Sequence, residues 1–170
     1  MRPLLLLLAL LLSGPAAAAD APWARIDVPG AAVSVELPGV VVPRHVVKQT
    51  LIGKVVSDTL LVEPEGGWMA VTVTHVPGVA LKVASEDSVL NRARKSVLAD
   101  TKGEQSSWQA VERGGRSGME LRFTVDKGSA VQQGVSEIHT FDGMVITLTY
   151  ALPKASVPDG DRFRASLRFD

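Results

Sequence analysis

Histidine is the side chain best suited to acid–base catalysis near neutral pH and to zinc binding, and this sequence contains three of them. His45, His75 and His139 lie on three different predicted strands. None has a second histidine two or four residues away, the spacing that presets a metal site on a strand or a helix. Glu137 lies two residues before His139, so these two are the pair that a catalytic or zinc site would use. We expect instead that all three histidines are ordinary sheet residues.

Two short motifs resemble catalytic or calcium-binding sequences but lack a required part. Residues 115–118, Gly-Arg-Ser-Gly, do not have the spacing of a nucleophile elbow and precede a strand, so we predict a hairpin loop there. Asp159 and Asp161 resemble the start of a calcium loop, but the twelfth position, where such a loop needs a glutamate, falls on Asp170. One of these aspartates is therefore predicted to cap a helix. No catalytic, cofactor-binding or metal-binding residue is assigned.

Two surface features are candidates for binding a partner. Basic residues on one side of a predicted helix would suit an acidic protein or an anionic lipid, although basic residues also favour the C-terminal half of any solvated helix. Tryptophans could line an apolar groove, but Trp68 is expected in the core. The candidate partner-binding residues are Trp23, Trp108, Arg92, Arg94 and Lys95.

One strong amphipathic helix is predicted over residues 85–102. Its apolar residues recur at the spacings that place them on one face, namely Val89, Leu90, Ala93, Val97 and Leu98. Ser85 can cap the first backbone N–H groups, and Gly103 suits a left-handed residue after the last turn. The residues that favour the start and the end of a helix therefore agree with the spacing of its apolar residues.

Strands are predicted before and after this helix. Residues 26–30 and 32–38 are predicted to form two short strands, and residues 46–62 two paired strands broken at Gly53. Residues 68–76 alternate between apolar and polar side chains, which predicts a further strand. Beyond the helix the period returns to two, so that Glu120 and Arg122 lie on a solvent-facing side of the sheet. Gly134 suggests a bulge, and residues 142–143, Asp-Gly, predict a tight hairpin. The sequence thus predicts an α+β fold, an antiparallel β-sheet flanked by one main amphipathic helix and a short C-terminal helix.

Residues 1–19 have the features of a secretory signal peptide, and residues 20–170 match one domain. The leader has one basic residue, an apolar stretch shorter than the roughly 20 residues that cross a bilayer, and small residues before Asp20. We therefore expect no stable membrane span after cleavage. The chain has no cysteine, which excludes a lipidated cysteine anchor and disulfides. Its 18 basic and 18 acidic residues do not favour nucleic acid.

The order of these elements resembles that of the PsbP-like superfamily. The resemblance rests on residues 33–38, the strand that begins at Trp68, the single amphipathic helix, the hairpin at 142–143 and the terminal segment 163–169. It covers nearly the whole chain after the leader, in pattern and spacing only. It implies an antiparallel sheet flanked by helices that works as a non-catalytic accessory or assembly module. No binding residue is carried over from the superfamily.

These observations favour an exported, non-catalytic binding or assembly module of the cell envelope, without a cofactor. Its partner would be an envelope protein or an apolar ligand, and its location the periplasm or the extracellular medium. Two alternatives stay open, a hydrolase or other enzyme whose site is assembled from distant residues, and a structural subunit of an envelope complex.

We expect signal peptidase to remove residues 1–19 by cutting between Ala19 and Asp20, because Ala17 and Ala19 supply the small side chains that the enzyme requires. The intact mass of the exported protein tests this directly. A species that keeps Met1 in the membrane fraction would show an anchored protein instead.

Overall fold

The computed structural model describes residues 21–50, 53–78 and 85–170. The predicted signal peptide, residues 1–19, and residues 51–52 of a predicted strand lie outside the described residues. The elements in chain order are β1 (Trp23–Asp27), β2 (Val33–Pro38), β3 (Val42–Thr50), β4 (Gly53–Val62), β5 (Trp68–His75), α2 (Glu86–Thr101), β6 (Glu104–Arg113), β7 (Arg116–Asp126), β8 (Val131–Phe141), β9 (Met144–Pro153), η1 (Lys154–Ser156), α3 (Val157–Ala165) and β10 (Arg168–Phe169). Within these ranges no helix is long and apolar enough to cross a membrane.

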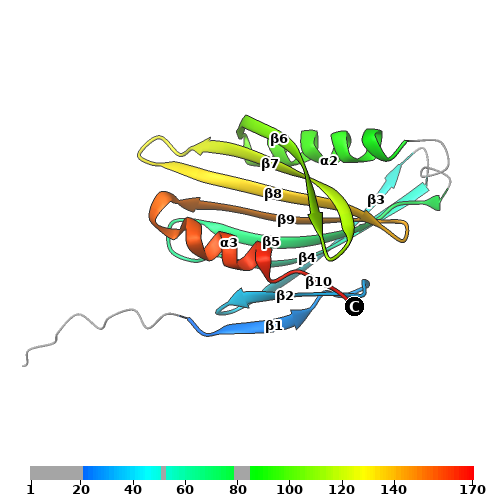
Figure 1. The fold of residues 1–170 in the computed structure, drawn as a ribbon, viewed down its shortest axis with the longest axis horizontal. Coiled ribbons are helices and arrows are strands. Elements are labelled where there is room, and N and C mark those ends of the chain that lie inside the picture. The colour runs from blue at the N-terminus through cyan, green and yellow to red at the C-terminus, as the bar shows by residue number, and fades with distance from the viewer. Residues whose placement is uncertain (1–20, 51–52, 79–84) are drawn as a thin grey trace, which may run out of the picture.

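Two antiparallel sheets form the framework. Seven strands pair in the order β3-β4-β5-β9-β8-β7-β6, and three short strands pair in the order β1-β2-β10. The helix α2 lies on one side of the large sheet, whereas α3 and the small sheet lie on the other (Figure 1). The predicted α+β fold with one main helix and a short C-terminal helix is confirmed.

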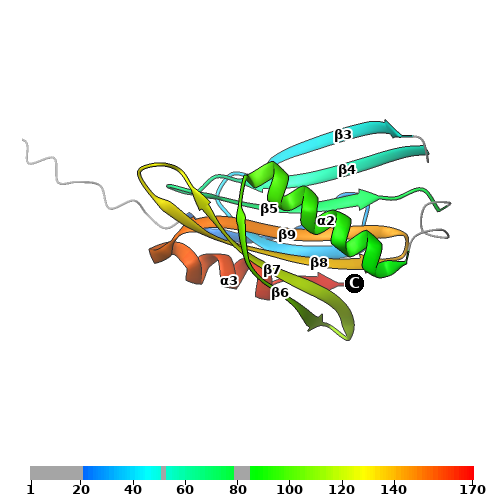
Figure 2. The same cartoon turned by 90° about the horizontal axis from the view of Figure 1, so that it is seen from above.

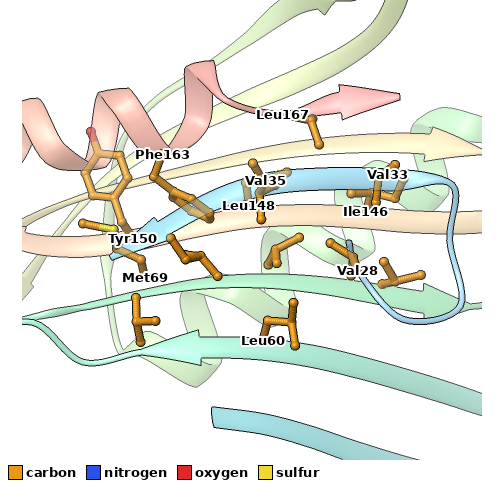
Figure 3. Close-up of a cluster of buried hydrophobic side chains, with 14 of the residues drawn as sticks. Val28, Val33, Val35, Leu60, Met69, Ile146, Leu148, Tyr150, Phe163 and Leu167 are labelled. Atoms are coloured by element: carbon orange, nitrogen blue, oxygen red, sulfur yellow. The ribbon is translucent and has the colours of Figure 1, made fainter. Parts of the chain in front are cut away.

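The main core lies between the large sheet and the layer formed by α3 and β2. Phe163 of α3, Val35 of β2 and Leu148 of β9 converge there, and all three are completely buried (Figure 3). A second, smaller set of contacts joins α2 to the opposite side of the sheet, where Leu90 packs with Ile138. Because β9 lies between these two layers, both of its faces are buried, which its run of apolar residues and threonines permits.

The helix α2 begins at its predicted cap but ends differently from the prediction. The side chain of Ser85 accepts a hydrogen bond from the backbone N–H of Ser88. The left-handed residue after the helix is Lys102, with φ 54°, and not Gly103. Gly103 is required for a different reason, because a Cβ there would lie 2.6 Å from a ring carbon of Phe123.

Two further predictions about the sheet have different outcomes. The hairpin at 142–143 is confirmed, with Asp142 and Gly143 both at positive φ between β8 and β9. The bulge predicted at Gly134 is wrong, because β7 and β8 pair without a register shift and the glycine makes room for the ring of Phe123. The one register shift that the described strand pairs show lies in β6, between Gln105 and Ser107.

The C-terminal helix is not capped by an aspartate. Its N-cap is Ser156, which makes no side-chain cap hydrogen bond, and both Asp159 and Asp161 lie within the helix. Asp161 instead accepts a hydrogen bond from the hydroxyl of Tyr150, at 3.0 Å. The prediction failed because α3 begins earlier, at Val157, with a proline in its first turn, where proline is well tolerated.

The placement of Leu90 predicts a large difference between two substitutions on α2. Leu90→Asp would bury an unpaired carboxylate against Ile138 and should lower the free energy of unfolding by about 3 to 5 kcal/mol. Lys95→Ala, on the exposed side of the same helix, should change it by less than about 0.5 kcal/mol. Urea denaturation of both variants measures the two effects, and similar losses would mean that the helix packs through another face.

Candidate functional site

Two glutamates lie opposite each other on neighbouring strands, beneath α3. Glu120 of β7 and Glu137 of β8 are Cα partners in the sheet. Glu120 is 4 % exposed and Glu137 is 0 % exposed. The prediction that Glu120 faces solvent is therefore wrong, because α3 covers this part of the sheet. Two buried carboxylates so close together repel each other and need cations beside them.

Three arginines supply these cations. Arg113, the last residue of β6, binds both oxygens of Glu137, with Nε to Oε1 at 2.5 Å and Nη2 to Oε2 at 2.8 Å. Arg164 of α3 donates through Nη1 to Glu120 and to Glu137, the second contact at 3.3 Å. Arg122 donates through Nε to Glu120 at 2.7 Å. The network therefore joins α3 to three strands of the large sheet.

His139 completes the buried network. Its Nε2 lies 2.9 Å from Oε1 of Glu137, and its Nδ1 lies 3.0 Å from the carbonyl oxygen of Ser117. The ring is fully buried and packs edge-on against Phe169, with 5.5 Å between the ring centroids. Both ring nitrogens are thus engaged inside the protein, and neither is directed at solvent or at an open site.

The electrostatics of the network hold Glu137 in its ionised form. Burial raises the pKa of Glu137, but the hydrogen bonds and charges of Arg113 and His139 outweigh burial and lower this pKa to about 2. The hydrogen bond that Arg113 donates to Glu137 also raises the pKa of the Arg113 guanidinium. An ionised carboxylate has no proton to donate, and the oxygens of Glu137 already accept four hydrogen bonds from Arg113, Arg164 and His139.

This network lies apart from two depressions on the surface of the described part of the chain. Two shallow depressions lie along α2, one lined by Arg92 and its neighbours and the other at the hairpin that follows β8, and neither is lined by Glu137 or His139. Within the described ranges, no three histidine, cysteine, aspartate or glutamate side chains are placed to hold a metal ion. Glu137, one of the pair that the sequence singled out, links β6 and α3 to the sheet through Arg113 and Arg164, and His139 is hydrogen-bonded to this carboxylate.

The basic residues predicted on α2 lie together in the structure. Arg92, Arg94 and Lys95 line one shallow depression with Ser88 and Asn91. The guanidinium of Arg94 lies 5.3 Å from the ring centroid of Trp108 and also donates to the side chain of Gln105. Arg92 and Lys95 are exposed.

The two candidate tryptophans lie on opposite sides of the large sheet. Trp108 packs under α2, together with Trp68 and Phe123. Trp23 belongs to β1 in the small sheet, where the guanidinium of Arg162 lies 4.2 Å above its ring. The structure thus places Trp108 beside the basic residues of α2, whereas Trp23 belongs to a separate surface.

Sequence reasoning predicted the strand that corresponds to β3 but missed its exposure. Every residue of β3 is exposed, and β3 is the last strand at one margin of the large sheet (Figure 2). It carries Arg44 and Lys48 together with exposed Val46 and Val47. A sequence feature that could have indicated this exposed strand is the stretch 39–57, which has several valines and basic residues and no acidic residue.

Comparison with known proteins gives a match to one fold. No family model and no curated protein matches the sequence. The solution structure of cyanobacterial PsbP (CyanoP) from Synechocystis sp. PCC 6803 superposes with a TM-score of 0.59 at 16 % identity, covering 94 % of this chain and 99 % of that chain. The chain therefore has a PsbP-like fold, as its element order predicted.

The buried network predicts a specific loss of stability in acid. The pKa of Glu137 is lowered from 4.5 to about 2 in the folded protein, so its charge stabilises the fold fully above about pH 4.5. This contribution, about 3 kcal/mol, should disappear as the pH falls from about 4.5 to about 2. Urea denaturation at several pH values measures it.

Glu137→Gln should lower the free energy of unfolding by about 3 to 5 kcal/mol at neutral pH, because Arg113 and Arg164 lose a buried counterion. The stability of this variant should also change less as the pH falls from about 4.5 to about 2, because the titrating carboxylate is absent. Glu36→Gln is the matched control, since Glu36 also pairs with two arginines but is partly exposed. Glu36→Gln should lower the free energy of unfolding much less than Glu137→Gln does. Equal costs for the two variants would contradict a structural role for the buried network.

Proposed function

We propose that this chain is a non-catalytic binding or assembly module that works in the cell envelope after export. The observation that carries the proposal is the state of its buried acid–base groups. Glu120, Glu137 and His139 are engaged with one another or with arginines, and none of them lines the depressions along α2. A catalytic acid or base must reach its substrate with a free lone pair or proton, and these groups offer neither.

The exposed groups support binding. The large sheet is packed on one side by α3 and the small sheet and on the other by α2. In this arrangement two basic surfaces remain exposed, the side of α2 that carries Arg92 and Lys95 and the edge strand β3. In a chain with equal numbers of basic and acidic residues, such local concentrations of one charge orient a partner and accelerate its encounter.

The signal-like leader supports an exported location, the periplasm or the extracellular medium. A module of this kind needs neither a cofactor nor a metal, because it acts through its surface. The PsbP-like fold is compatible with this role, but the identity of the partner depends on the surface residues of this chain.

Site-specific photo-cross-linking in the exporting cell tests the proposal. A photoreactive amino acid would replace Lys95 on α2, Val46 on β3 or, as the control, exposed Lys127 in the turn between β7 and β8. We expect one reproducible protein adduct from Lys95 or Val46 and none from Lys127. If neither of the two surface positions gives an adduct above the Lys127 control, the chain is not a binding module.

A further inference from the structure

Among the strands that the structure describes, the edge strand β3 has a partner on one side alone. It spans nine residues, all of them exposed, and of the described strands it pairs only with β4. Strands at sheet margins carry unpaired N–H and C=O groups that can pair with another extended chain. Natural proteins usually keep such strands short or polar, so a long and partly apolar edge is unusual.

The apolar content of this edge is high. Of the five large hydrophobic side chains exposed in the described part of the chain, four lie in or just before β3, namely Val40, Val42, Val46 and Val47. Val46 is 45 % exposed and Val47 is 47 % exposed. Successive residues of a strand point to opposite faces, so both faces of β3 offer apolar contact beside the free backbone edge.

The edge strand β3 carries basic residues and no acidic residue. Arg44 and Lys48 lie on β3, and Lys54 lies opposite Gln49 on β4. Residues 39–57 contain no acidic residue. Among the residues that the structure describes, none forms an ion pair with Arg44, Lys48 or Lys54, whereas His45 is paired with Asp58 at 2.7 Å.

This charge disfavours a second copy of the chain as the partner. Antiparallel pairing of β3 with β3 would bring Arg44 and Lys48 of two copies together, with no carboxylate on either strand. Like charges across a strand pair are destabilising. A partner strand that carries carboxylates would instead convert each unpaired cation into a cross-strand ion pair.

We infer that β3 binds an extended acidic segment of a partner protein by strand addition. The inference rests on the proposed function and names the partner of one of its two surfaces. Arg44, Val46 and Lys48 follow one another at every second residue, so they share one face of the strand at intervals of about 6.5 Å. The segment that fits this face has acidic, apolar and acidic side chains at alternate positions, and its backbone pairs with the free edge of β3.

A synthetic peptide series tests this inference on the full exported chain. The probe is a fluorescently labelled peptide TETVTET, which places two glutamates and a valine at the required spacing. The first control, TTEEVTT, has the same composition but adjacent glutamates that point to opposite faces, and the second, TKTVTKT, reverses the charge. We expect TETVTET to bind at least about fivefold more tightly than TTEEVTT, and TKTVTKT to show no binding up to about 1 mM.

Two double variants locate the binding site. Arg44→Glu with Lys48→Glu should weaken TETVTET by about tenfold or more and create binding of TKTVTKT. Arg92→Glu with Lys95→Glu makes the same charge change on α2 and should leave the affinity for TETVTET within about twofold. Melting midpoints establish that both variants are folded. Hydrogen exchange should show slower exchange of amides in β3 when TETVTET is bound, which a purely ionic contact would not produce.

Four outcomes would overturn the inference: no binding of TETVTET, an equal loss of binding in the α2 variant, tighter binding to phosphatidylglycerol vesicles than to the peptide, or a dimer that shields β3. If the cross-linking at Lys95 still yields a protein adduct, the proposed function survives such a result. If neither Lys95 nor Val46 yields an adduct, both proposals fail together.

Discussion

The arrangement of this protein depends on two carboxylates that the sheet register places side by side. Glu120 and Glu137 are opposite each other on β7 and β8 and are both buried, so the fold is stable only if cations enter the same space. Arg164 enters from α3 and Arg113 from the end of β6. The position of α3 and the path of β6 therefore follow from charge compensation as much as from apolar packing.

The contacts that neutralise the two carboxylates also occupy the hydrogen-bonding atoms of Glu137 and His139. Arginines keep Glu137 ionised at neutral pH, and His139 directs its two nitrogens to Glu137 and to a backbone carbonyl. Other basic side chains are exposed and lie apart from this network, among them Arg92 and Lys95 on α2 and Arg44 and Lys48 on β3. The proposed binding surfaces are thus separated in space from the buried network.

Local signals in the sequence predicted the elements but not the contacts between distant residues. The cap at Ser85 and the Asp142–Gly143 hairpin depend on neighbours along the chain, and both are confirmed. The burial of Glu120 depends on α3, more than thirty residues away, so its alternation with apolar neighbours wrongly indicated solvent. Separation of Trp23 from Trp108 likewise depends on strand order, which a single sequence does not contain. Only the acid-free stretch 39–57 could have indicated the exposed edge in advance.

The positive charge of β3 affects both its pairing with other copies of the chain and its pairing with an acidic strand. A long edge strand with exposed valines would pair with its own copies, and positive charge at Arg44 and Lys48 opposes this pairing. Such repulsion acts only between like charges, so it leaves the edge open to a strand of opposite charge. Protection against self-association and selection of an acidic partner therefore need no separate features. A polar, uncharged edge would also resist aggregation, but it would not distinguish one partner from another.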